Sequence, residues 1–143
     1  MRERAERFAR PTNARTVLAL DFGLKRIGVA VGESELRTAH PLPPIAAPGF
    51  DDIGKLLAEW QPAQIVVGLP VAEQGEHPLA KKVERFARQL EGRFRLPVAR
   101  VDERFTSVEA ESRLRGGKKS SIDSVAAQLI LEQYFDQAAR ISS

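Results

Sequence analysis

The spacing of the apolar positions changes once along the chain. Before residue 50 the apolar residues come in short runs, at Thr16 to Phe22, Ile27 to Val31 and Arg37 to Ile45. Runs of this length, with turn residues between them, predict β-strands. The turn that begins at Gly23 makes the first two runs a candidate hairpin. The prolines of the third run place its end at a sheet edge or in a loop. This part of the chain therefore predicts three antiparallel strands.

After Asp51 the spacing becomes helical. Four apolar residues repeat at i, i+3, i+4 and i+7, which places them on one helix face that Pro62 closes. They are Ile53, Leu56, Leu57 and Trp60. The expected elements that follow are a strand at Gln64–Gly68, a helix at Leu79–Leu90, a strand at Val98–Asp102, a helix from Thr106 to about Gly116 and a helix at Ser121–Ala138.

Strands separated by helices should run parallel, with right-handed crossovers. The sequence thus predicts an α/β fold, with a five-stranded mixed sheet, helices on both faces and Thr16–Phe22 away from the sheet edge. Residues 1–14 are rich in arginine and show no periodic apolar face. We interpret them as a basic N-terminal extension, for which disorder is one reading, and residues 15–143 as a single domain.

Composition narrows the class of protein. The chain has 143 residues, of which 43% are hydrophobic and 29% charged, proportions typical of one globular domain. It has no cysteine, which excludes disulfides, thiol catalysis and cysteine-ligated zinc. No apolar run approaches the roughly 18 residues of a membrane span. The charged segment Met1 to Arg10 is not a secretory signal, so we expect a cytoplasmic protein without a membrane partner.

The net charge of +3 is weak evidence for an anionic partner, but the basic residues cluster. One cluster is the N-terminal extension, and the other holds Arg113, Arg115, Lys118 and Lys119. A solvated surface explains such runs equally well on composition alone. The functional interpretation is a mobile, glycine-hinged loop that binds phosphate without reading bases.

Carboxylates stand at the ends of three expected elements. Asp21 comes late in the first strand, Asp102 and Glu103 follow the fifth, and Asp123 opens the last helix, on the stripe that should face the sheet. Each has a structural explanation as well. Asp21 could cap a turn, Asp102 and Glu103 could form a solvated turn balanced by Arg104, and Asp123 suits a helix start.

Together these carboxylates would form an anionic pocket, where mutual repulsion raises the pKa of each acid unless a cation is present. Oxygen ligands of this kind select Mg²⁺ or Mn²⁺. Two such ions, roughly 4 Å apart, can activate water and stabilise the leaving oxygen in phosphodiester hydrolysis. Beside the 113–119 cluster, the residues expected to contact nucleic acid are Lys25, Arg26 and Arg104.

Other chemistry is less well supported. His40 and His77 are the only histidines, and surface loops explain them better than a zinc site does. Gly23, Gly28 and Gly32 do not form a dinucleotide-binding fingerprint, because a strand and not a helix follows the first glycine.

Four motifs in this order resemble the YqgF family, also called RuvX. They are Asp21-Phe22-Gly23 with Arg26–Gly32, Ile65–Pro70, Asp102–Ser107 with Val108–Ala110, and Ile122–Ser124 with Ala126-Ala127 and Ile130-Leu131. The resemblance covers about residues 15–138. It implies an RNase H-like fold related to Holliday-junction resolvases, and an endonuclease that matures the 5′ end of pre-16S ribosomal RNA.

The same resemblance implies that Asp21, Glu103 and Asp123 are the catalytic metal ligands, and it selects Glu103 over Asp102. The chain departs from the family after Pro70, where Ala72 stands in place of an asparagine and Gln74 in place of an aspartate. The substrate contacts of this loop are therefore open.

Structured RNA is the first candidate partner and branched DNA the second, with the protein a monomer or a weak dimer. A junction resolvase of the same fold is one alternative. An actin-like phosphotransferase is a weaker one, because that class needs two RNase H-like halves. A non-catalytic nucleic-acid-binding module is the third, because fold alone does not establish catalysis.

Overall fold

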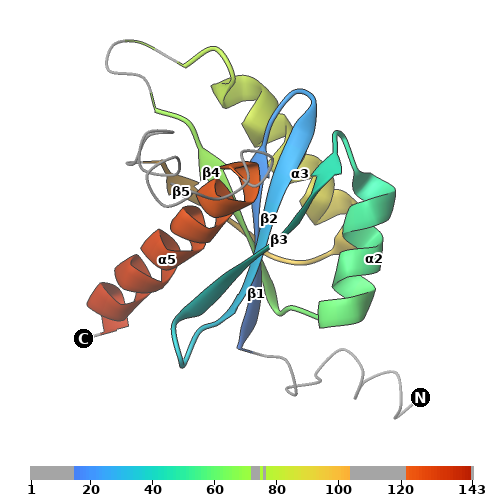
Figure 1. Ribbon diagram of the computed structural model, residues 1–143. Coiled ribbons are helices and arrows are strands. Elements are labelled where there is room, and N and C mark those ends of the chain that lie inside the picture. The colour runs from blue at the N-terminus through green and yellow to red at the C-terminus, as the bar shows by residue number, and fades with distance from the viewer. Residues whose placement is uncertain (1–14, 72–74, 76, 104–121, 143) are drawn as a thin grey trace.

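The computed structural model describes residues 15–71, 75, 77–103 and 122–142 (Figure 1). Its elements in chain order are β1 (Thr16–Phe22), β2 (Arg26–Glu33), β3 (Thr38–Ala46), α2 (Phe50–Trp60), β4 (Gln64–Leu69), α3 (Ala80–Phe94), β5 (Val98–Asp102) and α5 (Ile122–Ser142). Within the described residues, no helix is long and apolar enough to cross a membrane.

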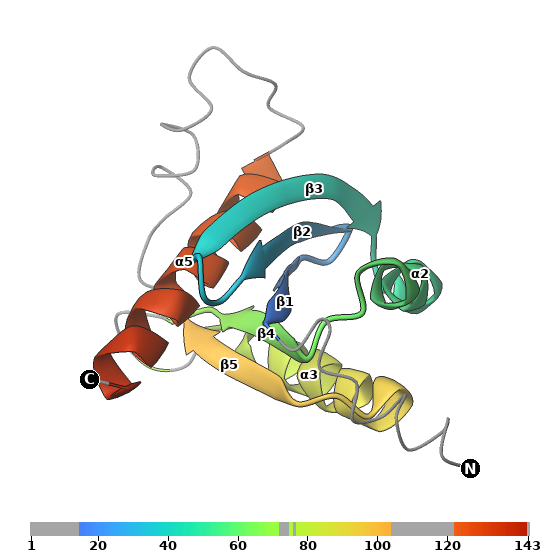
Figure 2. The same cartoon turned by 90° about the horizontal axis from the view of Figure 1, so that it is seen from below.

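The five strands form one mixed sheet in the order β3-β2-β1-β4-β5. β1 lies at the centre, antiparallel to β2 and parallel to β4, while β3 is antiparallel to β2 and β5 is parallel to β4. Figure 2 shows α5 on one face of the sheet and α2 and α3 on the other. The predicted α/β class, the three antiparallel strands and the interior place of β1 are confirmed.

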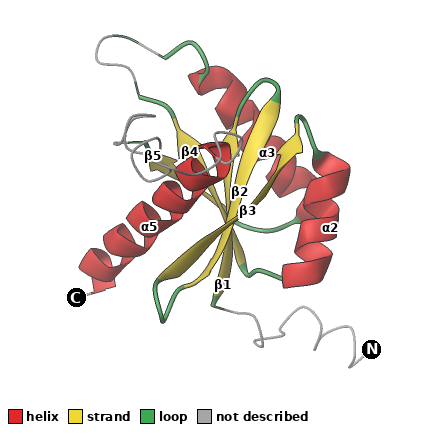
Figure 3. Cartoon of the chain, in the orientation of Figure 1, coloured by secondary structure: helices red, strands yellow, loops and turns green. Residues whose placement is uncertain are grey.

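The alternation of side chains along β1 explains why both faces are covered. Leu18 and Leu20 point into a core with α2 and α3, whereas Val17 and Ala19 point into a second core under α5. On the α5 side the residues of the central strands are small, which lets a long helix lie close to the sheet. Figure 3 shows α5 running diagonally across the strands.

Several boundaries differ from the prediction. The prolines of the third run were expected at a sheet edge or in a loop, and the edge is confirmed, since β3 continues through Pro41, Pro43 and Pro44. It is the outer strand of the described sheet, where missing backbone donors are tolerated. α3 and α5 each extend further than their apolar spacing predicted, since polar residues continue both helices. The expected helix from Thr106, the basic segment at 113–119 and the extension at 1–14 lie outside the described residues.

Candidate active site

Asp21 stands near the carboxyl end of β1, the central strand. β4 and β5 run parallel to β1, so all three strands end at the same edge of the sheet, the upper edge in Figure 1. The pKa of Asp21 is raised well above its ordinary value, first by burial and then by the negative charges of Glu103 and Asp123. The negative charges of Glu103 and Asp123, from two other parts of the chain, therefore act on the carboxyl group of Asp21.

Glu103 follows β5 directly and is partly buried. Its backbone N–H donates a hydrogen bond of 3.0 Å to the carbonyl oxygen of Leu69, at the end of β4. Gly68 makes room first for Ile130 of α5, whose side chain a Cβ there would overlap, and then for Glu103, whose Cγ would lie 3.1 Å from that Cβ. Burial raises the pKa of Glu103, whereas its neighbour Asp102 is exposed. The structure thus brings Glu103 into the electrostatic surroundings of Asp21.

Asp123 lies in the first turn of α5, where the helix crosses β2. A Cβ at Gly28 would overlap the backbone carbonyl of Asp123, so only glycine allows this approach. The buried hydroxyl of Ser124 accepts a hydrogen bond of 3.3 Å from the N–H of Val29, which fixes the helix start to the strand. Gly28 is the pairing partner of Asp21 across β1 and β2. The close packing therefore sets Asp123 beside Asp21.

Arg26, at the start of β2, is the counter-ion of Asp123. Its Nε donates a hydrogen bond of 2.9 Å to Oδ2 of Asp123, and most of the arginine side chain is exposed. Within the described residues, neither Asp21 nor Glu103 forms an ion pair with a basic side chain. Among the described residues, one of the three carboxylates is therefore paired with an arginine and two are not, which leaves a local excess of negative charge.

The donor set fits a hard divalent cation, because it consists of carboxylate oxygens only. The three side chains are not arranged as a complete metal-coordination site. In the described part of the chain, no three acidic or histidine side chains stand close enough together to hold a metal ion. The carboxylate of Asp123 instead faces Arg26. Arg26 is bonded to Oδ2 alone, so a metal ion would bind Asp123 through Oδ1 beside this ion pair, or through Oδ2 in its place.

Comparison with known proteins identifies the family. The model of the RuvX family, described as Holliday junction resolvase, matches residues 15–137. The chain belongs to the RuvX family. A relative from Nitrosomonas europaea, named "Putative pre-16S rRNA nuclease", is 53% identical over 132 residues, which are 85% of this chain and 89% of the relative. By this membership the chain is a nuclease, a hydrolase of phosphodiester bonds.

Solved structures of resolvases share the fold of this RuvX chain. RuvC of Thermus thermophilus has a TM-score of 0.52 at 17% identity, with 89% of this chain and 96% of the other covered. The fowlpox virus resolvase in complex with Holliday junction DNA has a TM-score of 0.54 at 12% identity, covering 86% and 98%. The predicted RNase H-like fold is therefore confirmed.

The remaining predicted site residues of this RuvX protein divide into two groups. Lys25 and Arg26 are exposed in the β1–β2 turn, next to the carboxylates. The others lie outside the described residues, namely Arg104, Arg113, Arg115, Lys118 and Lys119. His40 is exposed on β3, and Nδ1 of His77 accepts a hydrogen bond of 3.1 Å from the N–H of Leu79. His77 therefore has a local structural role.

Sequence reasoning missed the residues that position the carboxylates. Gly28 and Gly68 each lie within a buried strand and give way to α5 or Glu103, and Ser124 ties α5 to β2. A signal was present, because glycine inside an apolar strand often marks a close approach of backbone. The sequence of the strand does not show which part of the chain will approach the glycine.

Proposed function

We propose that this chain is a divalent-metal-dependent nuclease in which Asp21, Glu103 and Asp123 hold Mg²⁺ or Mn²⁺, with two ions as the expected number. The observation that carries the proposal is the placing of three carboxylates at one sheet edge, where burial first and then the charges of Glu103 and Asp123 raise the pKa of Asp21. Such repulsion costs free energy in the folded protein, and a bound cation relieves it.

The bound ions would supply an activated water and neutralise charge on the phosphate. The chain's own residues would position these ions and contact the substrate. Asp21, on the central strand, fixes the position of the site, while the contact of Gly28 with α5 holds Asp123 over the sheet. Lys25 and Arg26 project from the adjacent turn and would contact the phosphate backbone. If Arg26 left Asp123, both carboxylate oxygens would be available to a metal ion, and the guanidinium of Arg26 would be available to a phosphate.

The substrate we propose is the 5′ end of pre-16S rRNA, in the cytoplasm, because this is the RNA in the name of a relative 53% identical to the chain. Branched DNA is the second candidate, since the family is described as Holliday junction resolvase. We further propose that residues 15–143 form the nuclease domain, as a monomer or weak dimer. In support, the family match begins at residue 15 and leaves the basic extension out.

The test is cleavage of a matched panel with Mg²⁺ or Mn²⁺: a single-stranded RNA, a pre-16S 5′-leader RNA and a four-way DNA junction. We expect cleavage of the leader RNA, dependence on the added ion and loss of activity in Asp21→Asn. The matched control is Asp102→Asn, the same change at an exposed aspartate beside Glu103, which should retain activity. Preferred cleavage of the junction selects the resolvase function. Binding without cleavage, unchanged by Asp21→Asn, contradicts the nuclease and selects a binding module.

A further inference from the structure

Charge is distributed unevenly around α3, a helix with no part in the carboxylate site. Its two acidic residues turn toward Arg100 of β5, with ion-pair distances of 2.8 Å for Glu84 and 2.7 Å for Glu91. Arg100 is mostly buried, so the two acids serve to attach the helix to the strand. The first three turns of the helix keep four basic residues at the surface, which are Lys81, Lys82, Arg85 and Arg88.

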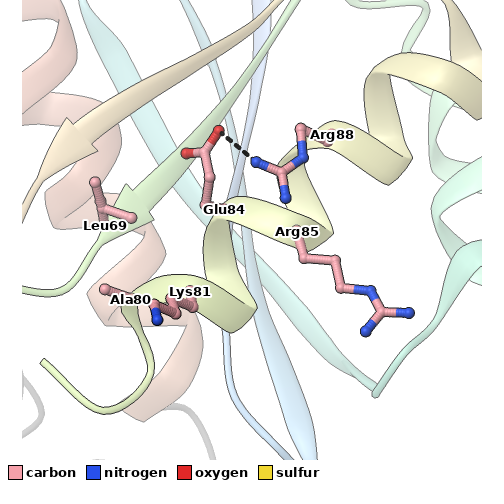
Figure 4. Close-up of a pocket in the computed structure, with 6 residues that line it drawn as sticks. All are labelled: Leu69, Ala80, Lys81, Glu84, Arg85 and Arg88. Atoms are coloured by element: carbon pink, nitrogen blue, oxygen red, sulfur yellow. Dashed lines mark ion pairs between the residues drawn. The ribbon is translucent and has the colours of Figure 1, made fainter.

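Three of these basic residues line a groove of about 490 Å³. Figure 4 shows its lining: Leu69 comes from the end of β4, and Ala80, Lys81, Glu84, Arg85 and Arg88 come from α3. Arg88 lies 3.8 Å from Glu84, which is held more closely by Arg100. Within the described residues, Lys81 and Arg85 form no ion pair with an acid. The groove therefore has an apolar side, formed by Leu69 and Ala80, and three basic side chains against one acid, Glu84, which Arg100 already compensates.

Helix stability does not explain this placement of lysines. The amino end of a helix carries partial positive charge, so acids stabilise it and lysines do not. α2 follows that rule, with Asp51 and Asp52 in its first turn. α3 has no acid in its first turn, and Lys81, which lines the groove, stands there instead. A bound anion would compensate for this charge.

The groove adjoins the carboxylate site. Leu69 lines the groove, and its carbonyl oxygen accepts the hydrogen bond from the N–H of Glu103. α3 and α5 lie on opposite faces of the sheet, so the groove and Asp123 flank the same strand ends from two sides (Figure 2). A nucleic acid held at this edge by the carboxylates and their metal ions can continue over the end of β4 onto α3.

We propose that the groove of Lys81, Arg85 and Arg88 binds the phosphate backbone of the nucleic-acid substrate at a distance from the cleaved bond. The inference rests on the proposed function and extends it to the length of substrate that the protein contacts. The ligand chemistry is a run of phosphodiesters, which RNA and DNA share. Both are therefore arms of the test.

The test compares two double variants with equal loss of charge. Lys81→Ala/Arg85→Ala removes two charges from the groove, and Lys55→Ala/Lys82→Ala removes two exposed charges from α2 and α3 outside it. Alanine favours helix at all four positions, so both variants should fold. Binding of a labelled pre-16S 5′-leader RNA and a labelled four-way DNA junction is measured by fluorescence anisotropy in EDTA, across a series of salt concentrations.

The groove variant should bind more weakly, and the slope of log K against log salt should flatten by about 1.4 for single-stranded and about 1.8 for duplex contacts. The control variant should keep a slope close to that of the wild type. Flattening with one probe alone assigns the groove to RNA or to DNA. Equal affinity and slope in the two variants overturn the inference and leave a solvated surface. Failure of the wild-type protein to bind either probe also overturns the inference, whereas the proposed function is overturned separately, by absence of metal-dependent cleavage of the substrate panel.

Discussion

Two groups of carboxylates in this fold differ in how their charge is compensated, Glu84 and Glu91 on α3 and Asp21 with Glu103 at the carboxyl ends of β1 and β5. Glu84 and Glu91 bind one arginine, Arg100, through charged hydrogen bonds of 2.7 to 3.1 Å. Asp21 and Glu103 have no such partner among the described residues, and they influence each other through repulsion. Both groups consist of carboxylates, and they differ in whether a basic side chain compensates their negative charge.

The pKa of Glu91 shifts in the opposite direction from the pKa values of Asp21 and Glu103. The hydrogen bond from Arg100 lowers the pKa of Glu91, and Glu84 and Glu91 in turn raise the pKa of the arginine. Burial raises the pKa of both Asp21 and Glu103. A group that costs free energy in the folded protein is a candidate for function, because structural needs alone would remove it. Asp21 and Glu103, the uncompensated group, are therefore the first residues to test.

The largest effect should come from the same substitution made once in each group. Glu103→Gln should lower cleavage by at least roughly a hundredfold, since it removes a proposed metal ligand, and the loss of a ligand costs more than that of a supporting residue. Glu91→Gln should leave the rate near that of the wild type, because its role is to attach α3. Single-turnover rates on the leader RNA measure both. Equal losses in the two variants would remove the distinction between the groups.

The next effect concerns the backbone contact that holds α5 over the site. Gly28→Ala would push a methyl group into the carbonyl of Asp123 and should lower the free energy of unfolding by about 3 kcal/mol. Gly92→Ala is the control, since a Cβ at this position in α3 meets nothing within 4 Å. It should stabilise the protein by roughly 0.5–1 kcal/mol. Urea unfolding of both variants checks the prediction, which a stable Gly28→Ala protein would contradict.

A smaller effect is expected when the compensated group loses its arginine. Arg100→Met keeps an unbranched apolar side chain but removes the guanidinium that pairs with Glu84 and Glu91, and Glu84 is left with its longer contact of 3.8 Å to Arg88. We expect a loss of about 1–2 kcal/mol in unfolding free energy, limited because both acids are partly exposed to water. Mn²⁺ binding at the other group should be unchanged. A variant as stable as the wild type would show that Arg100 has no net structural effect.

The smallest effect is a difference in pH dependence, measured by urea unfolding in EDTA. A raised pKa means that the folded protein holds its proton more tightly, so the wild type should lose stability relative to Asp21→Asn as the pH rises above about 4. A lowered pKa has the opposite sign. The advantage of the wild type over Glu91→Gln should be present above about pH 4.3 and decline as the pH falls further. Slopes of the same sign would contradict the account.

The sequence predicted the fold well because apolar spacing is a local signal. Thr16–Phe22 and Gln64–Gly68 could each be identified as buried strands from their own residues, and helices between strands implied parallel pairing. For β3 the three prolines left a choice between a sheet edge and a loop, and the structure has the edge position. That position depends on the order of the strands in the sheet, which short-range patterns do not encode.

The candidate site was predicted in part. Asp21 and Asp123 were identified as acids at element ends, but spacing alone could not choose between Asp102 and Glu103. In the structure Gly68 makes space for Glu103, a contact across two strands. The ion pair of Arg26 with Asp123 joins residues 97 positions apart and was equally inaccessible to local patterns. The basic groove on α3 was not predicted, since it depends on which way Glu84 and Glu91 turn.

The central claim is that the uncompensated carboxylates bind a divalent ion, and titration of the metal-free protein with Mn²⁺ tests it most directly. Isothermal calorimetry and the shift in melting temperature are measured for the wild type, Asp21→Asn and Glu91→Gln. We predict saturable binding and a higher melting temperature in the wild type and Glu91→Gln, and neither in Asp21→Asn. Without Mn²⁺, Asp21→Asn should melt above the wild type, because repulsion is relieved. Equal Mn²⁺ binding in all three proteins would place the metal elsewhere and contradict the account.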